Sequence, residues 1–401
     1  MPSQQLPPDL DPRGRHRGDG RGSQYAARGI GRVIGAIVSI GLLLVAGYTW
    51  YQYRDLDRNV SRLDVSVGEP ATPDQPDIDG QDQNILVVGN DDRSTMSDKE
   101  VKDLHVGRDG GSLATDTMMI VHVPADGSRA TLISLPRDTM VDVPDGYGTN
   151  KLNAPYALAY SAAMGRYGST MSPPAARSEA RKAGADLLLK TVTTFTGLSI
   201  DHYVQIDLLG FYRLSTAIGG VPINLCHDVD DRHKTNVAHG SDGGSGLHLK
   251  KGRHDISGKQ ALEFVRQRHG LDNGDFDRVK RQQYFLTAAF RRVAGSVGIL
   301  FELRRLKDAL RTSVYLDRHL DLLDLARQLE NLTANNIVGK TIPVSLDGTA
   351  SPKQVKRFVA TVIGRADTSK SKSKSKSKSK STSSSRRSTP KPTAVDAKCI
   401  D

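Results

Sequence analysis

The chain has 401 residues, of which 37% are hydrophobic and 5% aromatic, a low content that indicates that part of the length does not fold into one compact body. Its formal charge of +11 is concentrated at the two ends. Residues 1–32 carry six arginines against three aspartates, and residues 366–401 carry ten lysines or arginines against three aspartates, which leaves about +1 for everything between. This distribution gives little support to a nucleic-acid-binding core.

The chain contains only two cysteines, Cys226 and Cys399, and no CxxC pair, which excludes a structural zinc site and a disulfide framework. A single bridge between the two is the remaining possibility. Because Cys399 lies in a tail whose composition indicates disorder, we expect the two thiols to stay unpaired.

An uncharged run of 21 residues, Val33–Tyr53, is long enough to cross a hydrocarbon core, which needs ~20 helical residues. Aromatic residues gather at its far end, and six arginines precede it. The positive-inside rule then keeps the N-terminus in the cytoplasm and places everything after Arg54 outside the cell membrane, which argues against nucleic acid as a ligand. A cleaved signal peptide is the alternative interpretation.

Composition divides the chain into five predicted parts. In order, they are a disordered cytoplasmic segment (1–32), a transmembrane helix (33–53), an extracytoplasmic stalk (54–83), a catalytic domain (84–365) and a disordered Ser/Lys-rich tail (366–401). We expect the tail either to lie along anionic wall polymer or simply to keep the protein soluble.

Hydrophobic patterns in the domain predict strands that alternate with helices, which indicates an α/β fold with layers of helix on a sheet. The expected strands are 84–89, 118–123, 130–135, 203–207, 221–224 and 337–344. The expected helices are 154–164, 175–195, 208–218, 257–264, 300–312, 318–332 and 352–363, with a further helix that carries Arg278, Arg281 and Gln282.

Polar residues stand at the ends of three predicted strands. Asp91 and Arg137 follow their strands, and Asp116 opens its own. These groups could converge at one sheet edge, where open α/β sheets usually bind ligands. Two aspartates without nearby histidine or cysteine suit Mg²⁺ better than Zn²⁺, although each aspartate could also serve only as a turn or strand-start residue.

A second candidate site lies in the stretch from Gly252 to Phe285. Arg266 and Arg268, two apart, would share a face only in extended chain, so we expect the preceding helix to have unwound there. Arg278 and Gln282 share a face of the next helix. Such guanidiniums fit a multiply charged anion such as pyrophosphate, although solvated helix ends are the simpler interpretation.

A cluster of acidic and histidine residues, His227, Asp228, Asp230, Asp231 and His233, is interpreted as an ordinary exposed loop rather than a metal site.

Six motifs, in this order and after a single N-terminal span, resemble the LytR-CpsA-Psr family of membrane-anchored cell-wall enzymes. They read NILVVGNDDR, TDTMMIVHV, ISLPRDTMV, NKLNAPYALA, VQIDLLGF and FVRQRHGLDNGDFDRVKRQQ. The resemblance implies an α/β/α sandwich with a central mixed sheet and a Mg²⁺-dependent phosphotransferase. It would move a glycopolymer from an undecaprenyl-pyrophosphate carrier to peptidoglycan through a phosphodiester bond.

The resemblance also implies roles for individual residues. Asp91 and Asp116 would bind the metal, and Asp275 would hold the arginines or orient the acceptor. The pyrophosphate-binding set would be Arg137, Lys151, Arg266, Arg268, Arg278 and Gln282, with Arg266, Arg268, Arg278 and Asp275 taking part in catalysis.

One position departs from the family pattern, because Ala114 stands where some members have an arginine two residues before the second aspartate. Arg93 or Arg108 could substitute, or the site could have one cation fewer. Two other functions are considered. The first is a non-catalytic binder of lipid-linked or anionic wall polymers. The second is a membrane-tethered regulator of transcription, which would need a cytoplasmic domain, and residues 1–32 are too short and too glycine-rich to form one.

Overall fold

The computed structural model describes residues 82–106, 111–231, 244–294, 311–364 and 399–400, with short gaps, and parts of 47–68. The chain divides into two compact units, residues 1–55 and 56–401, and the fold described below is that of the second. No helix among the described residues has the length and apolar character needed to cross a membrane. The predicted span 33–53 falls almost entirely outside the described residues, as do residues 1–32 and most of the tail.

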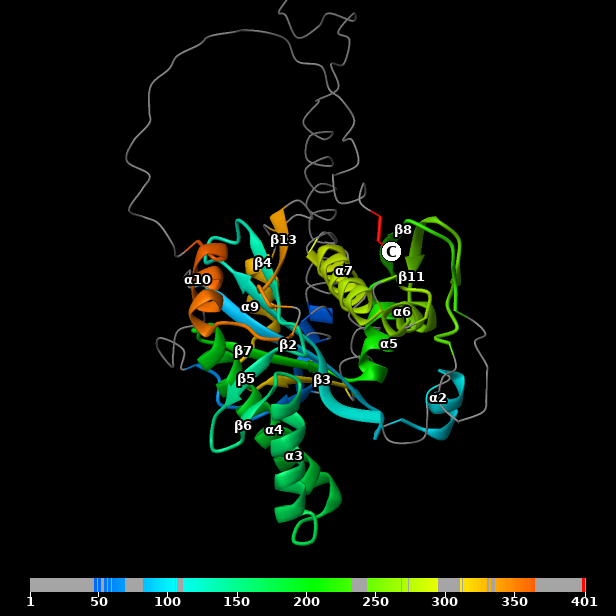
Figure 1. Cartoon of the computed structure of the whole chain (residues 1–401). Helices are drawn as coiled ribbons and strands as arrows, with labels where there is room; N and C mark the ends of the chain where they lie inside the picture. The colour runs from blue at the N-terminus through cyan, green and yellow to red at the C-terminus, as the bar shows by residue number, and fades with distance from the viewer. Residues whose placement is uncertain are drawn as a thin grey trace, which may run out of the picture. The chain divides into compact units, whose positions relative to one another are not determined.

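A seven-stranded mixed sheet forms the centre of the domain (Figure 1). In spatial order its strands are β1 (Ser61–Leu63), β12 (Val314–Asp317), β7 (His202–Ile206), β2 (Gln83–Asp92), β3 (Gly111–Val123), β4 (Ala130–Ser134) and β13 (Ile337–Thr341). The pairs β1–β12, β7–β2 and β4–β13 are parallel, and the others are antiparallel. The predicted α/β fold with a mixed sheet is therefore confirmed.

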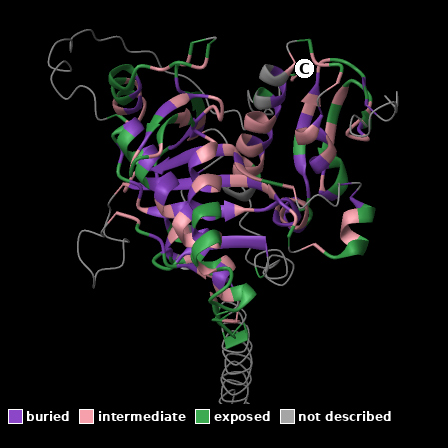
Figure 2. Ribbon diagram, turned by 60° about the horizontal axis from the view of Figure 1, so that its bottom comes forward, coloured by how far each residue is buried: buried purple, intermediate pink, exposed green. Residues whose placement is uncertain are grey.

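Strand β2 explains why the sheet is covered on both faces. Its side chains alternate, so that Leu86 and Val88 join one hydrophobic cluster while Ile85 joins another. A strand that is apolar on both sides has to be packed on both sides, and Figure 2 shows the strands of the sheet largely buried.

Three helices cover the face to which Leu86 points, namely α3 (Ala154–Tyr167), α4 (Pro173–Thr196) and α10 (Pro352–Val362). Helix α4 begins with two prolines after Ser172 and ends at Gly197, whose φ of 70° is the left-handed conformation that closes helices. The other face is packed by α7 (Asp275–Ala294) and α9 (Leu322–Gln328).

A smaller hydrophobic cluster lies beside the sheet. It is formed by α5 (Leu208–Ala217), α6 (Gly258–Arg266), α7 and the antiparallel pair β8 (Val221–Leu225) and β11 (Gly252–Ile256).

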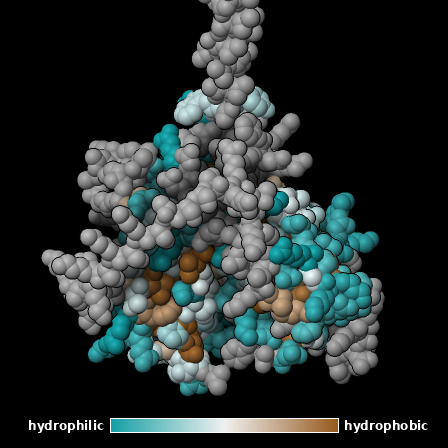
Figure 3. All heavy atoms as spheres, turned by 90° about the horizontal axis from the view of Figure 1, so that it is seen from above, coloured by the Kyte–Doolittle hydropathy of each residue, from teal (hydrophilic) through white to brown (hydrophobic). Residues whose placement is uncertain are grey.

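The hydrophobic side chains that reach the face drawn in Figure 3 form two separate groups, each bordered by hydrophilic residues. The remaining elements are α2 (Asp98–Asp103), the hairpin β5 (Met140–Val143) and β6 (Gly148–Lys151), and the pair β9 (Val229–Asp230) and β10 (His248–Leu249).

Two strands of the main sheet lie where no strand is predicted. Strand β1 falls in the segment predicted as a stalk, so the ordered domain begins before residue 84. Strand β12 falls between the helical runs predicted at 300–312 and 318–332; the second run is represented by the shorter α9, and the first lies almost wholly outside the described residues. Strands of three or four residues carry too little periodicity to be detected.

The C-terminal residues correct the prediction that both cysteines are unpaired. Cys226, directly after β8, forms a disulfide with Cys399 across 173 residues of sequence. Ile400 pairs in parallel with Leu225, donating its N–H to the Asn224 carbonyl at 2.8 Å and accepting from the Cys226 N–H at 3.1 Å. Composition predicted disorder for the whole tail and could not reveal that its last residues extend the β8–β11 sheet.

We expect the double substitution Cys226→Ser/Cys399→Ser to lower the free energy of unfolding by about 2–4 kcal/mol, because the bridge restricts the unfolded chain. Denaturant titration of both proteins without reductant measures the loss. Wild-type protein treated with reductant should fall to the level of the variant, and equal stability of all three samples would contradict the expectation.

Candidate active site

The C-terminal end of β2 and the start of β3 form the first part of the site. Their antiparallel register shifts after Gly89 and again after Asn90, so β3 carries extra residues opposite β2. Thr117 faces Gly89 and Thr115 faces Asn90, which leaves Asp116 as the extra residue of a β-bulge. Bulges redirect side chains beside active sites, and this one brings Asp116 next to the strand that carries Asp91.

Each of the two predicted metal-binding aspartates is paired with an arginine. The Arg93 guanidinium binds both carboxylate oxygens of Asp91, with Nε at 2.8 Å from Oδ1. Arg137 donates from Nη1 to Asp116 Oδ1 at 2.7 Å. The Arg93 side chain is only 9% exposed. Of the two arginines that could substitute for the one missing at Ala114, Arg93 lies beside the first aspartate, and Arg108 lies outside the described residues.

Backbone hydrogen bonds hold the predicted LPRD and NKLN motifs together. The Arg137 carbonyl accepts from the Asn153 N–H at 3.1 Å, and the Asn153 carbonyl accepts from the Thr115 N–H at 3.2 Å. Asp138 joins the two predicted cations, since it contacts Arg137 Nε at 3.4 Å and Lys151 Nζ at 2.8 Å. Five side chains from four segments thus gather at one end of the sheet: Asp91, Arg93, Asp116, Arg137 and Lys151.

Partial burial would raise the pKa of Asp138, but the hydrogen bond from Lys151 and the charge of Arg137 outweigh it and hold the pKa below its ordinary value of 3.8. A depressed carboxyl pKa stabilises the fold above the unfolded pKa, and that contribution is lost as the pH falls through the folded pKa. We expect wild type to melt above Asp138→Asn at pH 7 and the difference to shrink below pH 3.8. A difference that is constant between pH 7 and pH 2 would contradict this origin.

The second part of the site is the junction of α6 and α7. Helix α6 ends at Arg266, and Gln267 has the extended angles φ −54° and ψ 132°, so the helix unwinds within the predicted VRQR motif. Gln267 is 3% exposed and donates to the His269 carbonyl at 2.8 Å, while its own amide oxygen accepts from Arg281. The Arg281 guanidinium also lies over the Phe264 ring, 5.1 Å from its centre. Arg281 therefore fixes the turn that carries the VRQR motif.

The remaining predicted residues differ in what the structure describes of them. Arg278 is 4% exposed on α7, and Gln282, one turn later, donates to the Val265 carbonyl at 3.2 Å. Arg268 and the side chain of Asp275 lie outside the described residues. Leu262 and Val265 of α6 belong to the same hydrophobic cluster as Leu104 and Val106, which lie after Arg93 in the chain.

Beneath the first part lies a buried charge pair that no sequence pattern revealed. Arg181 of α4 donates to Asp92 Oδ2 at 3.3 Å, and its guanidinium lies 4.7 Å from the centre of the Tyr315 ring. Asp92 follows Asp91 directly and also accepts from the Ser94 N–H at 2.9 Å. Asp92 and Arg181 are 89 positions apart in the sequence, so only the fold brings them together.

Three carboxylates of the acidic and histidine cluster after β8 lie against a lysine or a histidine. Asp228 binds Lys250 at 2.8 Å, Asp230 lies 3.5 Å from His248, and Asp231 lies 3.3 Å from His269. His233 lies outside the described residues. Across the described part of the chain, no three His, Cys, Asp or Glu side chains gather as a metal site would require.

Two carboxylates beside arginines would fit a Mg²⁺ ion that the protein and a phosphorylated substrate bind together. Mg²⁺ commonly takes one or two protein carboxylates and fills its other positions with water and substrate phosphates. Asp91 and Asp116 could supply these two ligands, and the arginines now paired with them could turn to the phosphates.

The fold and this site define an α/β protein with paired cations and carboxylates at one end of its central sheet. The sequence profile of the LytR_cpsA_psr family matches residues 55–382, and the chain belongs to this family.

Two curated relatives are enzymes or factors of the cell wall. The cell wall biosynthesis protein LcpA of Corynebacterium glutamicum is 34% identical over 366 residues, which cover 86% of this chain and 68% of LcpA. The polyisoprenyl-teichoic acid–peptidoglycan teichoic acid transferase TagU of Oceanobacillus iheyensis is 27% identical over 76% of this chain and 84% of its own length.

Two solved structures share the fold. Bacillus subtilis TagV has a TM-score of 0.50 and 21% identity over 71% of this chain and 98% of its own. TagT bound to LIIa-WTA has a TM-score of 0.50 and 18% identity over 76% of this chain and the whole of its own.

Proposed function

We propose that the protein is a phosphotransferase that moves a glycopolymer from an undecaprenyl-pyrophosphate carrier to peptidoglycan, forming a phosphodiester bond. The observation that carries this proposal is the set of three pairs at one end of the sheet, in which Arg93 binds Asp91, Arg137 binds Asp116 and Lys151 binds Asp138. A relative named as a teichoic acid transferase supports the choice of substrate class.

The chemistry of the reaction accounts for these residue types. Pyrophosphate esters react slowly because their charge repels nucleophiles, so catalysis consists mainly of positioning and of neutralising charge. Arg137 and Lys151 would bind oxygens of the pyrophosphate and stabilise the charge that develops on the leaving phosphate. Arg266, Arg268 and Arg278 would approach from the α6–α7 junction, and Gln282 would hold that junction to α6 through the Val265 carbonyl.

Mg²⁺, held by Asp91 and Asp116, would polarise the phosphoryl oxygens when bound. Asp275 is proposed to orient either the arginines or the acceptor hydroxyl.

We further propose that the domain lies outside the cell membrane, tethered by one helix at residues 33–53 with the N-terminus in the cytoplasm. The disulfide between Cys226 and Cys399 supports an oxidising compartment, because cytosolic thiols are kept reduced. A tether of this kind would hold the domain beside its lipid-linked substrate.

Replacing both Asp91 and Asp116 with asparagine separates an enzyme from a non-catalytic binder. We expect a strain that lacks related genes and carries this variant to lose wall glycopolymer attachment, measured as polymer released from purified peptidoglycan. Asp142→Asn, on an exposed position of β5, is the matched control and should retain attachment. Full attachment with both aspartates replaced would favour the binder.

A further inference from the structure

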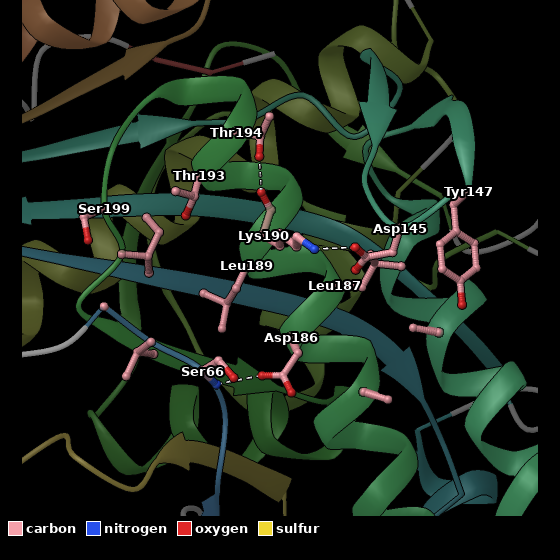
Figure 4. A pocket seen from close by; sticks show the side chains of 15 residues that line it. Ser66, Asp145, Tyr147, Asp186, Leu187, Leu189, Lys190, Thr193, Thr194 and Ser199 are labelled. Carbon is pink, nitrogen blue, oxygen red and sulfur yellow. Dashed lines mark hydrogen bonds and ion pairs between the residues drawn. The ribbon is translucent and has the colours of Figure 1, made fainter.

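A cavity of about 650 Å³ lies between the turn of the β5–β6 hairpin, helix α4 and the residues that precede β2 (Figure 4). The hairpin contributes Asp145 and Tyr147, and α4 contributes Asp186 and Lys190. Ser66 and Ser199 complete the wall on the opposite side, where Gly68 donates its N–H to the Ile200 carbonyl at 2.8 Å. None of the predicted site residues lines it.

The lining combines hydrogen-bonded polar groups with apolar side chains. Asp145 pairs with Lys190, and the Ser66 N–H donates to Asp186 Oδ1 at 2.7 Å. The side chains of Lys190 and Asp145 are still 55% and 53% exposed, so both keep hydrogen-bonding capacity toward a ligand. Thr193 and Thr194 add hydroxyl groups, and Leu187 and Leu189 add apolar surface.

The charges and hydrogen-bonding groups of this lining indicate which class of ligand it can bind. Lys190 is paired with Asp145, and Lys182 binds Asp186 at 2.7 Å. No uncompensated positive charge among the described residues of the lining therefore favours a phosphate or another polyanion. Charged groups at the wall disfavour a polyprenyl chain, which offers no hydrogen bond in place of the water that it would displace from Asp145 and Lys190. A ligand with many hydroxyl and amide groups can bond to carboxylates, a lysine and threonines while one face lies against the Tyr147 ring. These are the properties of a sugar.

The hairpin connects this cavity to the candidate active site. Its base carries the Asp138–Lys151 pair, and its turn carries the Asp145–Lys190 pair. Each strand of the hairpin has four residues, a length of about 13 Å at ~3.3 Å per residue. Asp145 and Gly146 have φ of 60° and 85°, and this left-handed turn brings Tyr147 to the cavity.

We infer that this cavity is a saccharide-binding subsite that holds sugar residues a few rings away from the reacting phosphate. The inference rests on the proposed function for the origin of the sugar, which belongs either to the peptidoglycan acceptor or to the glycopolymer. In both cases the cavity recognises hydroxyl and N-acetyl groups and sets the register of the chain at the active site.

The inference is tested by isothermal titration calorimetry of the full-length protein in detergent micelles without Mg²⁺. The affinity for each of two lipid-free probes is measured. The probes are glycan fragments of peptidoglycan and a repeating oligosaccharide of a wall glycopolymer, and the one that binds identifies the source. We expect Lys190→Ala to weaken binding about tenfold, as loss of a hydrogen bond to a charged group does, and Tyr147→Ala to weaken it about tenfold because the ring surface is lost. Tyr147→Phe should retain most of the affinity through its ring.

Lys353→Ala, an exposed lysine at the start of α10, is the matched control and should bind as wild type does. Unchanged affinity in both cavity variants, or no binding of either probe to wild type, would overturn the inference. Saccharide binding in a protein that transfers no polymer would contradict the proposed function and leave the subsite standing. Transfer without saccharide binding would overturn the subsite alone.

Discussion

Arg137→Ala is expected to lower the rate of glycopolymer transfer by two to three orders of magnitude, as loss of one transition-state contact commonly does. Arg137 is placed for that role because it contacts two carboxylates of the site, Asp116 at 2.7 Å and Asp138 at 3.4 Å. Single-turnover rates of the variant and wild type at saturating lipid substrate measure the effect.

Arg213→Ala is the matched control for Arg137→Ala. Arg213 is also a partly exposed arginine in an ion pair, with Glu100 at 2.8 Å, but it belongs to α5 and takes no part in the site. Its removal should leave the rate unchanged. A loss smaller than about tenfold for Arg137→Ala, in protein with a wild-type melting curve, would contradict the role given to Arg137.

Arg181→Met is expected to destabilise the domain by about 3–5 kcal/mol, because it leaves the buried Asp92 carboxylate without its counter-charge. The side chains of Arg181 and Asp92 are 8% and 6% exposed, so water cannot replace the lost partner. Loss of the contact with the Tyr315 ring adds to the effect. Denaturant titration of variant and wild type measures the difference in unfolding free energy.

A second substitution separates the stranded charge from the lost packing. Arg181→Met/Asp92→Asn removes both charges, and we expect it to regain part of the lost stability, since an amide is less costly to bury than a carboxylate. A double variant that is less stable than Arg181→Met would show that Asp92 is held mainly by other groups.

Motifs whose members are close in sequence could be predicted, and those assembled by the fold could not. Strand β2 and helix α4 follow from apolar periodicity and from proline and glycine at their ends. The unwinding after Arg266 follows from the spacing of the two arginines of VRQR, and Gln267 has extended backbone angles. In contrast, the Arg181–Asp92 pair and the strand β12 depend on contacts between distant segments.

The same limit applies to the C-terminus and to the cavity. The segment before Cys399 has the composition of a disordered chain, and nothing in it predicts that Ile400 pairs with Leu225. Neither Asp145 nor Tyr147 stands out in the sequence, and only the packing of their turn against α4 shows that they border a cavity. Local composition indicates only whether a segment tends to be ordered, whereas contacts with distant segments decide where Ile400 and the turn at Asp145 lie.

The most direct test of the central claim is cleavage of a synthetic polyprenyl-pyrophosphate saccharide by the purified full-length protein in detergent micelles. The reaction is followed with Mg²⁺ or EDTA, with and without peptidoglycan fragments, beside the variant Asp116→Ala. We expect polyprenyl phosphate to be released only when both Mg²⁺ and Asp116 are present. With the acceptor, we also expect a product in which a phosphate joins the saccharide to peptidoglycan. Tight binding of the lipid substrate without cleavage under any of these conditions would contradict the central claim.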